Sequence, residues 1–284
     1  AQAAVPVLER LGCEVIGLYC EMDGRFPHHH PDPTVSENMR DLIAEVAATG
    51  ADAGIMYDGD GDRIGVVDER GRIIRGDQLL LIFARSILEE NPGATFIGDV
   101  KCSQVVFEQI ERLGGRALMW KTGHSLIKAK MQEERALAAG EMSGHMFFAH
   151  RYLGFDDAVY ATCRLLEILS RSQAPASALL DSIPPACATP EIRLECPDHC
   201  KFEVVEQVKN TLRGRYTIND IDGVRAIMPG GWALVRASNT QPALVLRFEA
   251  SGPERLEEIR GEIETIVDGL LSGLTRPSKA ALNG

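Results

Sequence analysis

The chain has 284 residues, of which 45% are hydrophobic and 25% charged, and its formal net charge is −11. Such a composition is typical of a folded globular protein with two or three domains. The acidic excess argues against a nucleic acid partner, although local basic sites for small anions are compatible with it. No apolar run approaches the length that crosses a bilayer, so we expect no membrane partner.

Seven cysteines are scattered along the chain, which favours reduced thiols and a cytoplasmic location over a framework of disulfides. Cys196, His199 and Cys200 could form half of a zinc site. No second half is evident in the sequence, so we interpret them as ordinary buried or surface residues.

Residues 1–72 are predicted to form an α/β domain. Apolar spacing indicates a helix at 1–11, a strand at 14–19 and a helix at 35–48, followed by two strands that flank an aspartate-rich loop. A parallel sheet normally has a strand before its first helix. We therefore expect the chain to begin partway into this domain.

Residues 73–184 are predicted to form a second α/β domain, because helices and strands alternate again. The elements expected are helices at 77–90, 104–113 and 155–170 and strands at 94–100, 116–120 and 137–140. Polar clusters follow three of these strands, at Lys101, His124 and Glu141. Open α/β sheets bind their ligands at the carboxyl ends of strands, so these clusters mark a candidate site.

Residues 173–190 are rich in alanine, serine and proline, and we interpret them as a linker. Residues 185–284 then change character, with helices expected at 202–212 and 253–271 around several strands with glycine turns. This order favours an α+β domain with an antiparallel sheet. The predicted fold is thus α/β, with two α/β domains, the first incomplete at its N-terminus, followed by an α+β C-terminal domain.

Asp58, Asp60 and Asp62 alternate with two glycines between apolar runs. Side chains that alternate along an extended segment face one side, and three converging carboxylates need a cation. Ligands that are all oxygen suit Mg²⁺ or Ca²⁺, and the fork of Arg63 suits a phosphate beside the metal. One alternative is a polar turn. Another is a calcium loop completed by Glu69, although Arg63 stands where such a loop needs glycine.

Two further loops carry groups that bind sugars and phosphates. Glu141 and Ser143 are two residues apart and can hold neighbouring sugar hydroxyls, while His145 can carry a proton near neutral pH. A second loop offers an arginine and three small hydrogen-bonding side chains, which suit a phosphate. Its residues are Arg236, Ser238, Asn239 and Thr240.

The aspartate loop at 58–63, Lys101, the turn at 122–124, the Gly-Glu-Met-Ser-Gly-His stretch at 140–145 and the loop at 236–240 occur in this order. Together they resemble the α-D-phosphohexomutases, most closely the bacterial phosphomannomutase/phosphoglucomutase branch, over about residues 1–270. The resemblance implies that residues 1–72, 73–184 and 185–284 are the second, third and fourth domains of that family.

The resemblance also implies roles for the candidate residues. Mg²⁺ would be held by Asp58, Asp60 and Asp62. Lys101, His145 and Arg63 would be catalytic. The substrate would be bound by His124, Glu141, Ser143, Arg236, Ser238, Asn239 and Thr240.

By the same resemblance, the function is isomerisation of hexose 1-phosphate and hexose 6-phosphate through a phosphoserine and a hexose 1,6-bisphosphate. The partners implied are glucose or mannose phosphates and an N-terminal phosphoserine domain. No Ser-His-Asn-Pro type loop occurs in the 284 residues. We therefore expect a fragment that lacks this domain and is inactive alone. The alternative is a non-catalytic module that binds metal and phosphosugar.

Overall fold

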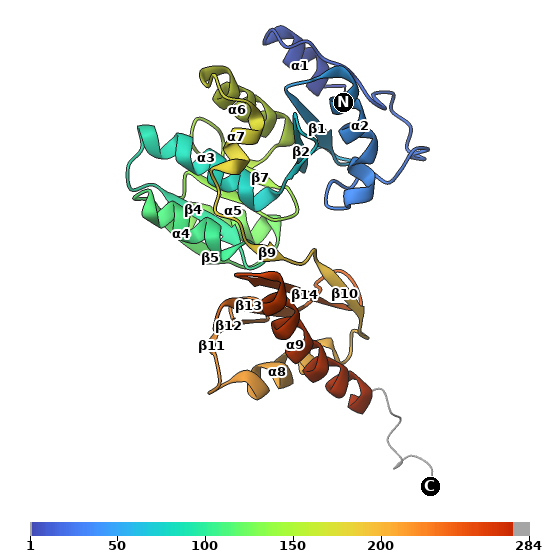
Figure 1. Ribbon diagram of the computed structural model, residues 1–284, viewed down its shortest axis with the longest axis vertical. Helices are drawn as coiled ribbons and strands as arrows, with labels where there is room; N and C mark the ends of the chain where they lie inside the picture. The colour runs from blue at the N-terminus through green and yellow to red at the C-terminus, as the bar shows by residue number, and fades with distance from the viewer. Residues whose placement is uncertain (1, 275–284) are drawn as a thin grey trace, which may run out of the picture. The chain divides into compact units, whose positions relative to one another are not determined.

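The computed structural model describes residues 2–274, and the chain divides into two compact units between Pro184 and Pro185 (Figure 1). Both units combine helices with sheets, as the sequence predicts. The last ten residues of the predicted third domain, 275–284, lie outside the described residues.

The first unit opens with a three-stranded antiparallel sheet of order β1-β2-β3. Its elements are α1 (Ala4–Arg10), η1 (Ser36–Met39), α2 (Arg40–Thr49), β1 (Ala53–Tyr57), β2 (Ile64–Asp68) and β3 (Ile73–Ile74). Helix α2 packs so closely on β1 that a Cβ on Gly54 would lie 2.8 Å from Val46 Cγ2. The loop between β1 and β2 is the aspartate-rich stretch.

The strand predicted at 14–19 is wrong. Residues 13–17 have no regular secondary structure, and the sheet β1-β2-β3 is built without them. An apolar run becomes a strand only where a neighbouring backbone satisfies its N–H and C=O groups. No strand among residues 2–274 pairs with this segment.

A five-stranded sheet of order β5-β4-β6-β7-β8 forms the centre of the first unit. Its elements are α3 (Gly76–Glu90), β4 (Thr95–Asp99), α4 (Gln104–Arg112), β5 (Arg116–Trp120), α5 (His124–Glu134), β6 (Ala138–Gly140), β7 (Met146–Phe148), β8 (Phe155–Asp156), α6 (Ala158–Arg171) and α7 (Ala176–Asp181). Strands β4, β5 and β6 are parallel, and β7 and β8 are antiparallel additions.

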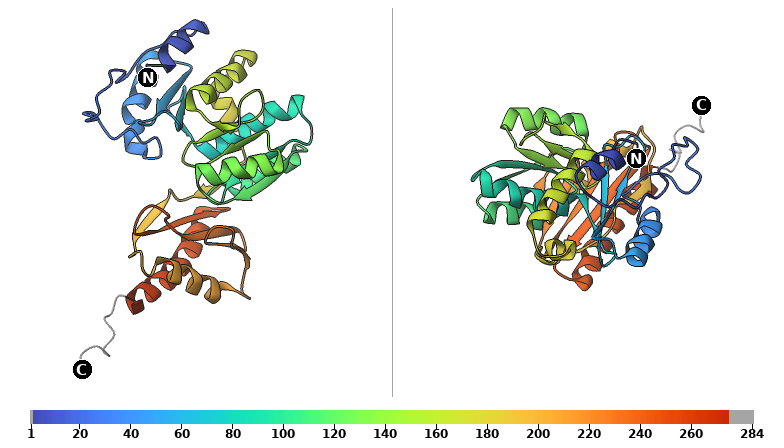
Figure 2. Two further views of the ribbon diagram at one scale, coloured as in Figure 1. Left: turned by 180° about the vertical axis from the view of Figure 1, so that it is seen from behind. Right: turned by 90° about the horizontal axis from the view of Figure 1, so that it is seen from above.

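Alternate residues of β4 face opposite layers of helices. Phe96 belongs to the core formed with α3, α4 and α6, whereas Ile97 packs with Ile127 and Met131 of α5. This alternation is the two-residue period of a strand buried on both faces. Figure 2 shows the helices on both sides of this sheet. The parallel strands β4, β5 and β6 therefore end at one edge, where the sequence predicts the polar clusters.

The second unit is a six-stranded antiparallel sheet with helices on one face. Its elements are β9 (Cys187–Ala188), β10 (Ile192–Glu195), α8 (Lys201–Leu212), β11 (Thr217–Asn219), β12 (Val224–Met228), β13 (Gly231–Ala237), β14 (Ala243–Ala250) and α9 (Pro253–Leu274). Apolar residues of α8 and α9, such as Val208 and Ile263, pack on alternate residues of the central strands, such as Ala233 and Val235. The predicted antiparallel sheet is observed.

The predicted linker at 173–190 is in part ordered structure. Helix α7 lies within it, and the backbone N–H of Ser177 donates to Glu69 Oε2 at 2.9 Å. Arg72 also contacts α7, because its Nη1 donates to Asp181 Oδ1 at 2.6 Å. Alanine and serine are compatible with a short helix once its ends are held, so composition alone misleads here.

All seven cysteines are free thiols. The sulfur atoms of Cys196 and Cys200 lie 3.8 Å apart in the core of the second unit. In the described part of the chain, no cluster of three metal-ligating side chains includes them. Residues 2–274 also contain no helix that is both long and apolar enough to traverse a bilayer.

Candidate metal and phosphosugar site

Asp58 organises the loop that joins β1 to β2. Its Oδ1 accepts hydrogen bonds from the backbone N–H groups of Gly61, Asp62 and Arg63 at 3.0, 3.1 and 3.1 Å. Its Oδ2 accepts a bond from Arg63 Nε at 2.6 Å. Burial works to raise the pKa of Asp58, but these bonds to Arg63 outweigh burial and hold the pKa below its ordinary value. Asp58 is therefore an ionised carboxylate.

The three aspartates offer a set of ligands that fits a hard divalent cation. Carboxylate oxygens of Asp58, Asp60 and Asp62 all lie within 4.8 Å of one another. The sequence predicted that they would converge through alternation along an extended segment. In the structure they converge because the loop turns around Asp58. Burial raises the pKa of Asp62, and repulsion from Asp58 and Asp60 adds to the rise against the attraction of His145. A cation among these oxygens would relieve the repulsion, and an all-oxygen set suits Mg²⁺.

The calcium-loop alternative does not agree with the structure. Glu69, which would complete such a loop, accepts the backbone N–H of Ser177 instead. The loop is also flanked by strands β1 and β2, whereas an EF-hand loop is flanked by helices.

Arg63 is fixed by two carboxylates. Besides the bond to Asp58, its Nη1 donates to Asp32 Oδ1 at 3.1 Å. Among the described residues, its hydrogen bonds use Nε and Nη1, so Nη2 is available to a phosphate oxygen.

The loop after β6 is bonded directly to the loop of aspartates. The N–H of Ile64 donates to the carbonyl oxygen of Gly144 at 3.0 Å, and Arg63 forms a β-bridge with His145. Gly144 has φ +100°, and a Cβ there would lie 2.5 Å from the carbonyl oxygen of Ile64. Glycine thus permits the two backbones to touch.

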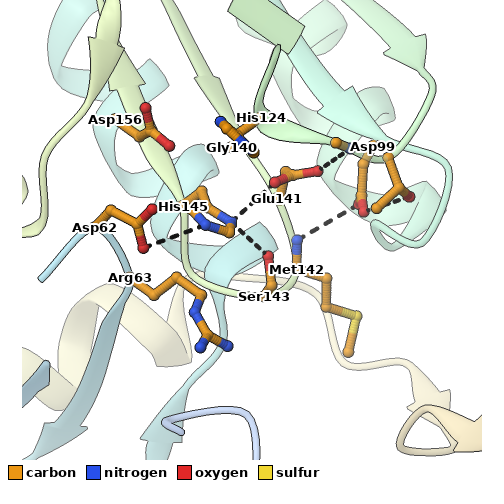
Figure 3. Close-up of polar contacts among 12 residues, drawn as sticks. Asp62, Arg63, Asp99, His124, Gly140, Glu141, Met142, Ser143, His145 and Asp156 are labelled. Carbon is orange, nitrogen blue, oxygen red and sulfur yellow. Dashed lines mark hydrogen bonds and ion pairs between the residues drawn. The ribbon is translucent and has the colours of Figure 1, made fainter. Parts of the chain in front are cut away.

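Glu141 and His145 form a buried ion pair at this junction (Figure 3). Glu141 is 1% exposed, and its Oε2 lies 2.9 Å from His145 Nδ1 while Oε1 accepts the N–H of Gly123 at 2.6 Å. Ser143 Oγ also lies 3.0 Å from His145 Nδ1. On the other side of the ring, Nε2 lies 3.4 Å from Asp62 Oδ1.

The electrostatics of this pair favour its charged form. Burial works to lower the pKa of His145, but the hydrogen-bonded carboxylate of Glu141 and the charges of Asp62 and Asp156 raise it above its ordinary value. Burial likewise works to raise the pKa of Glu141, and its bond with His145 holds it below its ordinary value.

Lys101 and His124 lie at the same edge of the five-stranded sheet. Lys101 follows β4, is buried, and its Nζ lies 3.6 Å from Asp99 Oδ2. His124 begins α5, directly after β5, and its ring stacks on that of His145 with centroids 6.1 Å apart. The first unit therefore gathers the predicted metal ligands, Arg63, Lys101, His124 and the loop at 141–145.

The predicted phosphate loop belongs to the second unit, where it begins with Arg236 at the end of β13 and continues into the turn that follows. Arg236 donates through Nε to Asp222 Oδ2 at 3.0 Å and through Nη2 to Asp222 Oδ1 at 3.4 Å. Ser238 Oγ accepts the N–H of Thr240 at 3.4 Å and that of Gln241 at 3.2 Å, which curls the loop. Asn239 and Thr240 are exposed at its tip.

Sequence reasoning missed four residues that hold these side chains. Asp32 pairs with Arg63, Asp222 pairs with Arg236, and Lys128 and Asp156 lie beside His124 and His145. The spacing of four between His124 and Lys128 on one helix was a usable signal. Asp32 and Asp222 are far from their partners in sequence, and no local pattern marks them.

Three family models match the chain. They are described as phosphoglucomutase/phosphomannomutase alpha/beta/alpha domain II at residues 1–71, alpha/beta/alpha domain III at residues 75–187 and C-terminal domain at residues 191–266. The chain belongs to the phosphoglucomutase/phosphomannomutase family.

Two bacterial proteins are among the relatives that match the chain. The chain is 50% identical to the phosphomannomutase/phosphoglucomutase of Pseudomonas aeruginosa over 275 residues, which are 96% of this chain and 59% of the relative. It is 47% identical to the phosphoglucomutase of Neisseria gonorrhoeae over 91% of this chain and 56% of that protein. The chain thus spans less than two thirds of these curated relatives.

A solved structure supports the same family fold. A phosphoglucomutase/phosphomannomutase family protein of Burkholderia thailandensis superposes with a TM-score of 0.87 at 43% identity, over 94% of this chain and 57% of that one. A more distant fold relative at 17% identity, the N-acetylphosphoglucosamine mutase of Aspergillus fumigatus, was solved with GlcNAc-6P and magnesium.

Proposed function

We propose that this chain is the metal-, sugar- and phosphate-binding part of a phosphohexomutase that interconverts hexose 1-phosphate and hexose 6-phosphate. The observation that carries the proposal is the direct bonding of the aspartate loop to the loop at 141–145. It supports a reaction in which a metal and a sugar are held side by side. The reacting phosphoryl group would come from a phosphoserine on a first domain that these 284 residues do not include.

Asp58, Asp60 and Asp62 would hold Mg²⁺, which supplies charge neutralisation for phosphoryl transfer when bound. Arg63, oriented by Asp58 and Asp32, would donate through Nη2 to an oxygen of the transferring phosphoryl group. Two carboxylates keep its fork from rotating, so the donor is preorganised.

The sugar would lie against the loop at 141–145, with Glu141 and Ser143 binding adjacent hydroxyls. In the structure described, both groups contact His145, so sugar hydroxyls would share or replace these bonds. His145 or Lys101 would accept the proton of the attacking hydroxyl. The bond to Glu141 supports His145, because a base needs an orienting partner, and His145 would act as the base in its neutral form.

The loop of Arg236, Ser238, Asn239 and Thr240 would bind the phosphate that is not reacting. Since a hexose 1,6-bisphosphate must present both of its phosphates in turn, this loop has to accept either one. Arginine and backbone N–H groups recognise any phosphate monoester, which suits that requirement.

The proposal is tested with the native polypeptide. Glucose 1-phosphate and mannose 1-phosphate are supplied with Mg²⁺, and ³¹P NMR follows the appearance of the 6-phosphates. Turnover that is lost in Asp60→Asn would support the proposal. Binding of both sugars by calorimetry without turnover would support the non-catalytic binding module instead.

A further inference from the structure

His124 and Lys128 lie one turn apart on one face of α5, since residues four apart in a helix are neighbours. Lys128 Nζ lies 3.3 Å from His124 Nδ1 and donates to Asp156 Oδ1 at 3.0 Å. The side chain of Asp156 is only 7% exposed, so it is a fixed anchor for the ammonium group. Figure 3 shows His124 and Asp156 near the ring of His145.

The chemistry of the ammonium group decides which nitrogen of His124 carries a proton. An ammonium has three N–H donors and no acceptor, so a hydrogen bond between Lys128 Nζ and His124 Nδ1 uses the lone pair of Nδ1. The imidazole then carries its single proton on Nε2 and is uncharged.

We propose that Lys128 is a positioning residue that holds His124 as the neutral tautomer with its proton on Nε2, so that Nε2 donates a hydrogen bond to an oxygen of the bound phosphosugar. The tautomer is inferred from the contact between His124 and the Lys128 ammonium group, whereas the phosphosugar as acceptor rests on the function proposed above. Asp156 completes the arrangement by balancing the charge of Lys128.

When His145 is neutral, the two stacked histidines have opposite tautomers. His145 Nδ1 faces the carboxylate of Glu141 and donates to it, which leaves any lone pair of that ring on Nε2. His124 has its lone pair on Nδ1, where Lys128 uses it. Of these two rings, only that of His145, in its neutral form, has a lone pair on Nε2 for the proton of a sugar hydroxyl, while His124 can only donate.

The tautomer is measured on native polypeptide labelled with ¹⁵N-histidine, by long-range ¹H–¹⁵N correlation without substrate. The signals of His124 are assigned by their loss in His124→Gln. We expect an unprotonated Nδ1 and a protonated Nε2. A proton on Nδ1 would overturn the proposal, whether Nδ1 alone or both nitrogens are protonated.

The role of Lys128 is tested by Lys128→Met, which keeps most of the aliphatic side chain and removes the charge. We expect His124 to become a mixture of tautomers and kcat/KM to fall roughly tenfold or more, as when partners that orient a histidine are removed. The matched control is Lys130→Met on the same helix, where the lysine pairs with Glu133 and Glu134. It should change neither property.

An unchanged tautomer in Lys128→Met would overturn the positioning role. The wild-type spectrum remains decisive if that variant fails to fold. A correct tautomer in a polypeptide without mutase turnover would reject the proposed function but support the role of Lys128 in fixing the ring.

Discussion

The N–H of Ile64 donates to the carbonyl oxygen of Gly144 at 3.0 Å, so the strand after the aspartate loop is bonded to the loop that carries Glu141 and His145. The candidate metal ligands and the candidate sugar ligands are thereby parts of one rigid junction. Their relative positions are fixed by backbone bonds, which side-chain motion does not disturb.

This junction predicts that Gly144→Ala is strongly destabilising. Positive φ costs a non-glycine residue about 1–2 kcal/mol, and here the new Cβ would also lie 2.5 Å from the carbonyl oxygen of Ile64. Gly154→Ala is the matched control, because Gly154 has φ +84° with open space around it. In chemical denaturation we expect losses of about 3 kcal/mol or more for Gly144→Ala and about 1 kcal/mol for Gly154→Ala. Equal losses of stability in the two variants would contradict the close contact between Gly144 and Ile64.

Substitutions of Asp58 and Asp60 should distinguish an effect on folding stability from an effect on metal binding. Asp58→Asn places an amide where Oδ1 accepts three backbone N–H groups, so we expect it to cost about 2 kcal/mol in EDTA. Asp60 is exposed, and Asp60→Asn should stay within about 0.5 kcal/mol of wild type in EDTA.

Adding Mg²⁺ should raise the Tm of the wild type, because a ligand that binds only the folded state stabilises it. The rise should be absent in Asp60→Asn, because one of the three ligands is weakened. A full Mg²⁺-dependent rise in Asp60→Asn would argue against the three-aspartate site.

Arg236→Lys tests the phosphate loop. Lysine cannot reproduce the fork that Arg236 presents beside Asp222, so we expect KM for hexose phosphates to rise about tenfold or more. Arg215→Lys is the control, since Arg215 pairs with Glu262 on the surface of the same unit. Steady-state kinetics of the native polypeptide give KM for both variants. An unchanged KM in Arg236→Lys would remove this residue from phosphate binding.

The assignment of Glu141 and Ser143 to sugar hydroxyls predicts substrate preference. If they bind O3 and O4, glucose and mannose phosphates should both be accepted, because these sugars differ at C2. Galactose 1-phosphate is inverted at C4 and would leave a buried polar group unpaired, so its kcat/KM should be at least roughly 100-fold lower. Comparable turnover of the three sugars would refute the assignment.

Much of the first unit could be predicted from local sequence. The strands β4, β5 and β6 are short apolar runs, and the polar residues after each one marked the edge where the candidate site lies. The spacing of Asp58, Asp60 and Asp62 similarly indicated a cation, because a cation relieves the repulsion among three neighbouring carboxylates.

The shape of the aspartate loop could not be predicted in the same way. Asp58 bonds the backbone up to Arg63, and this turn, not strand alternation, brings the carboxylates together. The pairings of Arg63 with Asp32 and of Arg236 with Asp222 depend on tertiary folding, which residue spacing does not encode. The strand predicted at 14–19 was wrong for the same reason, since a strand forms only where another strand pairs with it in the folded protein.

Helix α7 determines where the protein can be divided into fragments that fold. Its backbone and its Asp181 are tied to Glu69 and Arg72, so a truncation placed at residue 173 would strip a buried piece from the first unit. Ser177, which is fully buried, would become part of a dangling tail on the other fragment. A cut within residues 184–186, after the buried Ile183 and before β9, leaves each fragment with its own core. The linker between the two units is thus only a few residues long, and much shorter than the alanine-, serine- and proline-rich stretch at 173–190.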